Sequence, residues 1–432
     1  MRSFLVVLMG QVISLLGSAM TQFAVTVWAY ELTGSATTLA LTAFFGFAPG
    51  ILLSPVAGAL VDRWDRRLVM MLSDLGGGLA TVVLFLLYSA GNLQIWHLYV
   101  AGAVAGAFAA FQWPAYSAAI SLMIPREQYG RANGLLSLAG SLSGVVAPAL
   151  AATLLVVIGL RGVLLIDIVT FVIAIGAILA IRIPAPPVSE AGRAGRGSLL
   201  QEAFYGFRYI AARRSLLGLQ ITFFFINLTA TFTGVLTAPM LLARTGSDAT
   251  VLATVQSVGS VGGIVGGLLL SLWGGPKRRV HGVLLSMIGG SFLGEVVLGV
   301  GRSVWVWSAG MFMLVALHPI LNGSNQAIWQ AKVAPDVQGR VFAARRMIAQ
   351  ISAPVAMLLA GPLADRVFEP AMREGGALAP IFGGLVGTGA GAGMALMMVI
   401  TGILGVIVGA SGYLFKAIRD VELLLPDHEA AV

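Results

Sequence analysis

Residues 58–67 read Gly-Ala-Leu-Val-Asp-Arg-Trp-Asp-Arg-Arg, a charge-dense stretch that lies between two long apolar runs. The runs cover residues 39–60 and 68–90. Each is long enough to cross a bilayer core of about 30 Å, which takes about 20 residues of helix. The stretch between them is therefore predicted to be a short, charged loop that joins two membrane-spanning helices.

The composition of the whole chain agrees with a membrane protein. Hydrophobic residues make up 58% of the 432 residues, charged residues make up 10%, and the mean hydropathy is +0.92. Soluble chains average roughly 45–50% apolar and about 25% charged residues. The chain contains no cysteine, which excludes disulfides, thiolate catalysis and cysteine-ligated metals.

Apolar runs of membrane-spanning length recur along the chain. The last run is rich in glycine and too long for one straight span, so its ends are expected to leave the bilayer. The twelve predicted spans cover residues 4–30, 37–61, 68–90, 95–123, 132–158, 163–181, 215–242, 249–273, 282–300, 303–331, 341–363 and 380–415.

The positions of lysine and arginine predict the orientation, because positively charged loops stay in the cytoplasm. If the N-terminus is cytoplasmic, the inside segments hold 21 of the 26 basic residues. Both termini are therefore expected to be cytoplasmic. The net charge of +8 follows from this topology, so we expect no nucleic acid partner.

A polar segment divides the spans into two sets of six. Three prolines, Pro184, Pro186 and Pro187, end the sixth span, because proline cannot continue a helix. Residues 199–214 read as an amphipathic helix with a basic side that suits a cytoplasmic membrane surface. The predicted organisation is a six-helix bundle at 1–181, a cytoplasmic linker at 182–214, a second bundle at 215–415 and a cytoplasmic tail at 416–432.

Short motifs recur in the two halves in the same order. Residues 32–35 match 244–247, and the pair Gly58 and Trp64 matches Gly267 and Trp273 at the same separation. Pro125 with 130–131 matches Pro335 with 339–340. The halves therefore look like parallel repeats of one six-helix unit.

The loop spacing Gly58-x-Leu60-x-Asp62-Arg63-x-x-Arg66-Arg67 resembles that of the major facilitator superfamily, the large class of twelve-helix secondary transporters. The first half is similar, more narrowly, to the branch that contains macrolide-efflux and enterobactin-export proteins. The resemblance implies two pseudo-symmetric six-helix halves that rock around a substrate near the midplane. The residues that carry the narrower resemblance are 30–35, 62–63 with 65–67, 111–112 with 114–115, 125–128 with 130–133, Asp167 and Phe171.

The resemblance also implies roles for individual residues. The loop residues would form a conformational latch, although they could instead act only as topology determinants. Ser271 stands where Asp62 would map in the second half, so any latch is asymmetric. Small residues and a proline in the fifth span match an exporter pattern that permits bending or simply close helix packing. The implied latch residues are Gly58, Asp62, Arg63, Arg66 and Arg67, and the implied hinge residues are Gly134 and Pro148.

Ionisable residues inside the spans are candidates for proton coupling, because a charge in a bilayer costs ~2.5–3.5 kcal/mol and so indicates a function. Asp167 and Glu295 are the first candidates for the proton site, and His318, Asp74 and Glu31 are the further ones. The alternatives are structural: Asp167 could pair with Arg161, Asp74 could bond at the interface or join the latch, and His318 could be a neutral packing residue.

Polar and aromatic residues at mid-depth are candidates for a substrate cavity. Gln112 and Asn322 each lie 13 residues before the corresponding proline of their half, which places both about 20 Å from the cytoplasmic loops. The alternative is that these side chains face lipid or hold helices together. The full set of candidates is Gln112, Trp113, Asn227, Phe224, Asn322, Asn325 and Trp329.

These observations favour a proton-coupled exporter of amphipathic organic compounds such as drugs, macrolides or siderophores. The alternatives are an importer or lipid flippase on the same fold, and a non-transporting receptor or partner subunit. The chain has no GxxxxGK[ST] phosphate loop and no catalytic triad or histidine metal cluster, so we expect no enzyme activity, cofactor or metal. The expected protein is a monomer in the bacterial inner membrane, with a small amphipathic substrate, protons and lipids as its partners.

Overall fold

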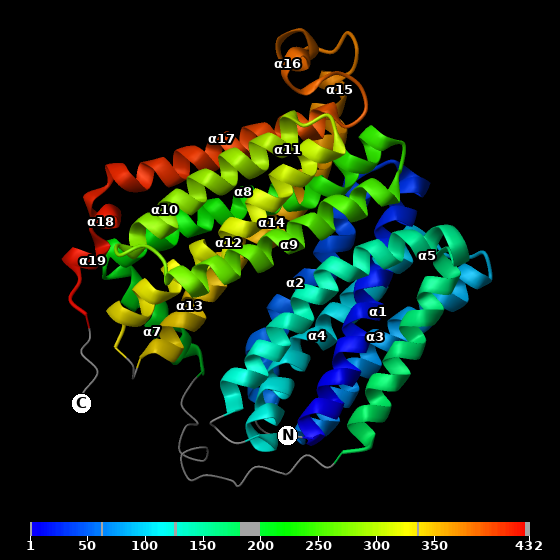
Figure 1. The fold of residues 1–432 in the computed structure, drawn as a ribbon, viewed down its shortest axis with the longest axis horizontal. Coiled ribbons are helices and arrows are strands. Elements are labelled where there is room, and N and C mark those ends of the chain that lie inside the picture. The colour runs from blue at the N-terminus through cyan, green and yellow to red at the C-terminus, as the bar shows by residue number, and fades with distance from the viewer. Residues whose placement is uncertain (1, 62–63, 125–127, 182–198, 335–336, 428–432) are drawn as a thin grey trace. The chain divides into compact units, whose positions relative to one another are not determined.

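The computed structural model describes residues 2–61, 64–124, 128–181, 199–334 and 337–427. Within these residues the chain forms helices and no strand (Figure 1), which confirms the predicted all-α class. The first half contains α1 (Arg2–Thr33), α2 (Ala36–Val61), α3 (Arg66–Ser89), α4 (Ile95–Met123) and α5 (Tyr129–Leu179).

The second half begins with the short helix α7 and continues through long helices that are locally interrupted. Two of the interruptions, η2 and η3, are π-helical segments. The elements are α7 (Leu199–Ala211), α8 (Arg214–Thr245), α9 (Ala249–Trp273), α10 (Arg279–Gly289), η2 (Gly290–Val296), α11 (Val297–Val300), α12 (Val304–Lys332), α13 (Gln338–Gln350), α14 (Ser352–Leu363), η3 (Ala364–Phe368), α15 (Glu369–Met372), α16 (Ala379–Val386), α17 (Ala392–Leu414), α18 (Lys416–Arg419) and α19 (Val421–Leu424).

Eleven helical stretches of the described chain are long and apolar enough to cross a membrane. One of them lies in α5, a helix of 51 residues that is broken at Gly159. The φ angle of Gly159 is 65°, a backbone conformation that glycine adopts readily and other residues rarely do. The break divides α5 into the predicted fifth and sixth spans, which is consistent with twelve crossings.

The last predicted run is divided, and its spanning helix is shorter than the run. Residues 380–415 form two helices, α16 and α17, and the second begins only at Ala392. Three glycines between them, at 387, 389 and 391, have positive φ angles. The glycine-rich start of the run therefore forms a turn, and the crossing helix is α17.

Contacts among the helices divide the chain into two compact units. The first unit holds α1–α5 together with Leu241–Ser257, and the second holds the other described helices. The repeated motif after the first span of each half has the same backbone form, because Gly34 and Gly246 have φ angles of 59° and 65°. Both helices thus end on a left-handed glycine.

The predicted amphipathic helix forms as α7, and it packs against α13 within the second unit. Tyr209 and Ile210 on α7 are buried. The backbone of Gly206 lies so close to the carbonyl of Arg340 that a Cβ atom there would overlap it. The side chains of Tyr209 and Ile210, near the end of this helix, are therefore covered by protein.

The tail supplies an acidic cap to α10. Two backbone N–H groups, of Arg279 and Val280, donate to the carboxylate of Glu422 at 3.1 and 3.0 Å. Arg278 pairs with Asp420 at 3.0 Å. Hydrogen bonds from Arg419 and Arg278 hold the pKa of the Asp420 carboxyl below its ordinary value.

A buried lysine completes the contact between the tail and the helices. The ammonium of Lys332, at the end of α12, donates to the carbonyl of Glu422 at 2.7 Å and pairs with Asp427 at 2.6 Å. The Lys332 side chain is only 3% exposed. The tail therefore ties together the adjoining ends of α10, α12 and α17.

We predict that Glu422→Ala destabilises the second unit by about 1–2 kcal/mol, because it leaves two N–H groups at a helix N-terminus without their charged acceptor. The measurement is the Tm of the purified protein in detergent. Glu374→Ala makes the same chemical change at an exposed position and serves as the control. Equal Tm values for the two variants would contradict the prediction.

Candidate functional site

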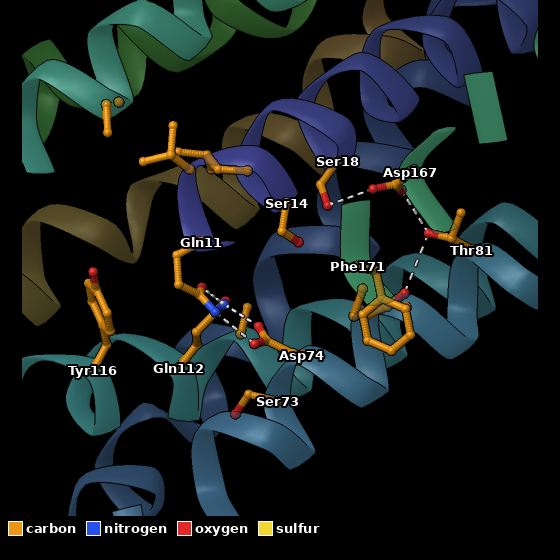
Figure 2. Close-up of a pocket in the computed structure, with 18 of the residues that line it drawn as sticks. Gln11, Ser14, Ser18, Ser73, Asp74, Thr81, Gln112, Tyr116, Asp167 and Phe171 are labelled. Atoms are coloured by element: carbon orange, nitrogen blue, oxygen red, sulfur yellow. Dashed lines mark hydrogen bonds between the residues drawn. The ribbon is translucent and has the colours of Figure 1, made fainter. Parts of the chain in front are cut away.

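A cavity of about 830 Å³ lies inside the first unit, lined by α1, α3, α4 and α5 (Figure 2). Aliphatic side chains and glycines make up half of its lining residues, Tyr116 and Phe171 are its aromatic members, and the others are polar or charged. Two carboxylates line it, those of Asp74 and Asp167, which are 7% and 3% exposed. Together with Gln112, they bring three of the predicted site residues into one cavity.

Two glutamines hold Asp74. Gln11 Nε2 donates to one carboxylate oxygen at 2.8 Å, and Gln112 Nε2 donates to the other at 2.7 Å. The same Gln112 nitrogen lies 3.2 Å from Gln11 Oε1. The carboxylate is thus held by neutral amide donors from α1 and α4, and the three side chains form a closed triangle.

Two hydroxyls hold Asp167, which lies in the part of α5 after the break. Ser18 on α1 donates to Oδ1 at 3.1 Å, and Thr81 on α3 donates to Oδ2 at 3.0 Å. The close approach of α1 requires glycine at 17, since a Cβ atom there would overlap the Thr170 hydroxyl. The packing of α1 on α5 therefore positions the donors around the carboxylate.

Neither carboxylate forms an ion pair with any described residue. Arg161, the suggested partner of Asp167, is exposed and lies over the ring of Phe85 at 5.7 Å. The described residues that line the cavity include no lysine, arginine or histidine.

Sequence reasoning placed Gln112 in the cavity but missed the other donors to these two acids, Gln11, Ser18 and Thr81. Gln11, Ser14 and Ser18 all line the cavity, and their spacing of three and four residues places them on one face of α1. A polar stripe within an apolar span was the signal that could have revealed them.

A smaller cavity, of about 220 Å³, lies inside the second unit. It brings together four of the predicted site residues: Asn227 from α8, Glu295 from η2, and His318 and Asn322 from α12. Glu295 is 1% exposed, whereas His318 and Asn322 are exposed. The π-helical turn at Glu295 fits a functional position, because such turns are frequent at functional sites.

A hydroxyl donates to Glu295, as hydroxyls do to Asp167. Thr233 on α8 donates to Glu295 Oε2 at 3.1 Å, and its oxygen lies 3.3 Å from that of Thr401 on α17. Counted by spans, the first cluster uses the first, third and sixth spans, and the second uses the seventh, ninth and twelfth. The two clusters thus occupy equivalent helices of the repeat, with the acid moved from the last helix to the third.

The latch lies only partly within the described residues. Asp62 and Arg63 fall outside them, and no side-chain contact is described for Gly58 or Arg66. Arg67 donates to the carbonyls of Ile178 and Leu179 at 3.2 and 2.7 Å, at the C-terminus of α5. Asp65 caps α3 by accepting from the Leu68 N–H at 3.1 Å.

In the second half, Ser271 donates to the carbonyl of Gly267 within its own helix. The loop of the second half thus has no acid at this position. Glu422 of the tail instead caps α10. The third helix of each half thus has an acidic cap, from the loop in one case and from the tail in the other.

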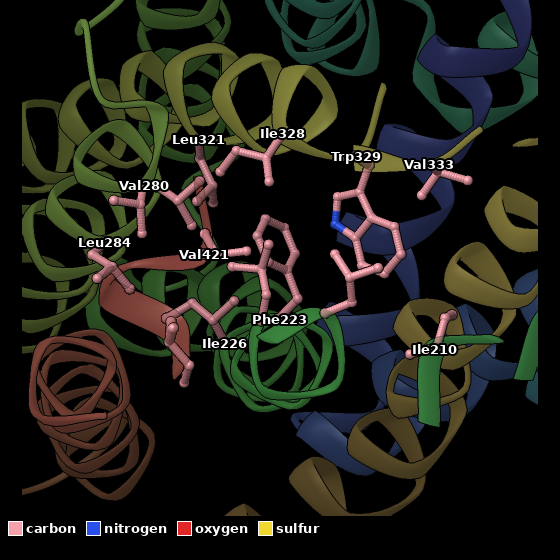
Figure 3. Close-up of a cluster of buried hydrophobic side chains, with 14 of the residues drawn as sticks. Ile210, Phe223, Ile226, Val280, Leu284, Leu321, Ile328, Trp329, Val333 and Val421 are labelled. Atoms are coloured by element: carbon pink, nitrogen blue, oxygen red, sulfur yellow. The ribbon is translucent and has the colours of Figure 1, made fainter. Parts of the chain in front are cut away.

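Several other candidates lie away from both cavities. Trp329 is fully buried in an apolar cluster (Figure 3) and donates to Asn325 Oδ1 at 3.0 Å. Phe223 lines the second cavity where Phe224 was expected, because one residue turns a helix by about 100°. Glu31 is exposed near the end of α1.

The remaining candidates concern α4 and α5. Trp113 lies in α4 and Gly134 in α5, and the surroundings of both fall outside the described part of the structure. Pro148 is buried within α5, upstream of the break at Gly159.

Comparison with known protein families matches residues 7–357 to the Major Facilitator Superfamily. This chain belongs to that superfamily. It is therefore a transporter and not an enzyme, and its spanning helices make it a multi-pass bacterial membrane protein.

Similar curated proteins include efflux proteins. The chain is 27% identical to macrolide efflux protein A of Streptococcus pyogenes over 377 residues, which cover 83% of this chain and 88% of that protein. It is also 27% identical to the multidrug efflux pump Tap of Mycolicibacterium fortuitum over 357 residues, which cover 77% and 82% of the two chains. The predicted resemblance to the macrolide-efflux branch is confirmed.

Solved structures support the fold. A bacterial homologue of the human lysosomal transporter Spinster, inward-facing and unoccupied, matches 96% of this chain and 97% of its own with a TM-score of 0.69 at 17% identity. A bacterial homologue of the iron transporter ferroportin matches 95% and 98% with a TM-score of 0.65 at 16% identity. Both likenesses concern the fold alone.

We predict that Gln112→Leu lowers the stability of the first unit by about 1–3 kcal/mol, because the Asp74 carboxylate loses a donor while it stays buried. The triple variant Gln11→Leu/Gln112→Leu/Asp74→Leu should recover most of that loss, because all three members of the triangle are then removed together and no polar partner is left unpaired. The measurement is Tm in detergent for each variant. A triple variant less stable than Gln112→Leu would contradict this description of the Asp74 triangle.

Proposed function

We propose that this transporter exports amphipathic organic compounds, cationic ones in particular, in exchange for protons. The observation that carries the proposal is the cavity of the first unit, which combines an apolar lining with two buried carboxylates and no described cationic side chain. The efflux relatives favour the outward direction.

The size of the cavity fits a small-molecule substrate. Ligand pockets are typically ~300–1,000 Å³ and mostly apolar, with a few polar groups that fix orientation, and the cavity measures about 830 Å³. Aliphatic side chains would bind the apolar body of a ligand. Asp74 and Asp167 would attract a protonated amine or another lipophilic cation, and they would disfavour an anion.

Asp167 is the proposed proton site. Its hydroxyl donors can rotate, so Ser18 and Thr81 can donate to the ionised carboxylate and can accept from the protonated one. In the outward-open state a proton from outside would neutralise the carboxylate and weaken its hold on a cationic substrate. In the inward-open state the proton would leave to the cytoplasm, and a new substrate would bind the ionised site.

The Asp74 triangle is the proposed orienting group of the same cavity. Its amides keep the carboxylate in place, and they leave oxygen lone pairs available to a donor on the ligand. We retain the loop residues 58–67 as a proposed latch and residues 182–214 as the linker between two rocking bundles of the inner membrane. The position of Arg67 supports the proposed latch, because a cation at the C-terminus of α5 is favoured by the helix dipole.

The test uses everted membrane vesicles with an acidic lumen, to which macrolides, lipophilic cations and siderophores are added. We predict substrate-evoked proton release from the lumen in the wild type and its loss in Asp167→Asn, because the amide cannot carry the proton. Asp248→Asn changes an exposed aspartate at the start of α9 and should behave as the wild type.

Three outcomes would contradict the proposal. Proton release that survives in Asp167→Asn would remove this residue as the coupling site, and loss in Glu295→Gln alone would transfer the role to the second unit. No response to any compound, with folded protein present, would favour a flippase or a receptor.

A further inference from the structure

The cavity of the second unit is smaller than that of the first. At about 220 Å³ it is smaller than the ~300–1,000 Å³ typical of pockets for organic ligands. Seven of the fourteen lining residues are polar or titratable, and they are Asn227, Thr231, Ser286, Ser291, Glu295, His318 and Asn322.

Several of these side chains already use a donor group in hydrogen bonds to the backbone. The atoms that remain available to a ligand are therefore mostly oxygen acceptors. Asn227 Nδ2 donates to the Phe223 carbonyl at 2.8 Å, and Asn322 Nδ2 donates to the His318 carbonyl at 3.1 Å. The Thr231 hydroxyl donates to the Asn227 carbonyl at 2.7 Å. Their side-chain oxygens therefore keep free lone pairs, while donors in each group are engaged with the backbone.

A hydroxyl with no partner points to a missing ligand. Ser291 lies one helical turn before Glu295, lines the same cavity and is 2% exposed. Its Oγ atom has no hydrogen-bond partner among the described residues. Buried polar groups in native proteins are nearly always paired, so a ligand or a water bound in this cavity would complete its bonding.

The charge of the cavity limits what that ligand can be. Glu295 and His318 are the titratable residues among the described ones that line it, and the described lining contains no lysine or arginine. The hydroxyls of Thr233 and Thr401 are neutral. One carboxylate balances one positive charge, and an unbalanced charge in an apolar bundle is costly, which disfavours a divalent ion.

We propose that this cavity is a binding site for a small monovalent cation, sodium, held by the Glu295 carboxylate and the oxygens of Ser291, Asn227 and Asn322. Hard cations prefer such carboxylate, carbonyl and water oxygens. The cation competes with the proton of Glu295. This site is separate from the substrate cavity and does not depend on Asp167 or on the direction of transport.

The test is a sodium titration of the purified, full-length protein in detergent, at mildly alkaline pH, with choline chloride keeping the ionic strength constant. Binding of radioactive sodium and the Tm are measured together. We expect saturable binding of about one ion per chain and a rise in Tm of a few degrees, because a ligand of the folded state stabilises it. Acidification should weaken sodium binding, because it protonates Glu295.

Matched variants separate this site from the first unit. Glu295→Gln should abolish the sodium-dependent rise in Tm, and Ser291→Ala should weaken sodium affinity several-fold without harming the fold, because its hydroxyl has no protein partner. Asp167→Asn should retain the full effect of sodium.

Three results would overturn the proposal: no sodium binding beyond the choline control in the wild type, binding unchanged in both Glu295→Gln and Ser291→Ala, or loss of binding in Asp167→Asn. Each can occur whether or not the vesicle test of proton exchange at Asp167 succeeds. The two proposals therefore fail separately.

Discussion

The constraint on which this structure depends is the burial of carboxylates in an apolar bundle with only neutral donors around them. Each ionised acid at mid-membrane costs about 2.5–3.5 kcal/mol on insertion scales, so the surrounding helices must supply hydrogen bonds. Asp74 receives amides from α1 and α4, and Asp167 receives hydroxyls from α1 and α3. The packing of α1 against α5 at Gly17 brings those donors close enough.

The second unit meets the same constraint with a different arrangement. Glu295 lies on the third helix of its repeat. Thr233, on the first helix of the repeat, donates to Glu295 and lies beside Thr401 on the sixth. The acid therefore lies on a different helix in each half, although the two clusters are formed by equivalent helices. The first cavity is large enough for an organic ligand, whereas the second is small and its polar side chains leave mostly oxygen acceptors free. This contrast underlies our assignment of an organic cation to one and an inorganic cation to the other.

Charged side chains at the helix ends have charged or backbone partners, whereas the buried acids inside the bundles have only neutral donors. Asp65 caps α3 and Arg67 caps the end of α5. Glu422 caps α10, and buried Lys332 holds the tail. The loop of the second half thus lacks the acid of the first, but the tail provides one.

Much of this fold can be predicted from the sequence, because spans, breaks and repeats are local signals. The apolar runs predicted the crossings, and the glycine at each left-handed turn, Gly34 and Gly246, marked the same helix end in both halves. The partners of the buried acids could not be predicted in this way. Asp74 and Gln11 are 63 residues apart, and only the packing of three helices shows that they meet.

The pairing of Trp329 with Asn325 illustrates the same limit within the candidate site. Both are polar or aromatic residues at mid-depth, as Asn322 is, yet they lie in an apolar cluster and Asn322 lines a cavity. Three residues along a helix separate these two environments. Depth could be read from the sequence, but the direction in which each side chain points required the neighbouring helices.

The central claim is that a proton on Asp167 and a cationic substrate compete in the first cavity, where Asp74 orients the substrate. The most direct test is the equilibrium affinity of the purified protein for tetraphenylphosphonium, measured across a pH series. The account predicts that affinity rises with pH, by up to about tenfold per unit where one proton is released per ligand bound, and that the rise disappears in Asp74→Asn/Asp167→Asn. Affinity in the wild type that is independent of pH, or a rise that persists in the double variant, would contradict it.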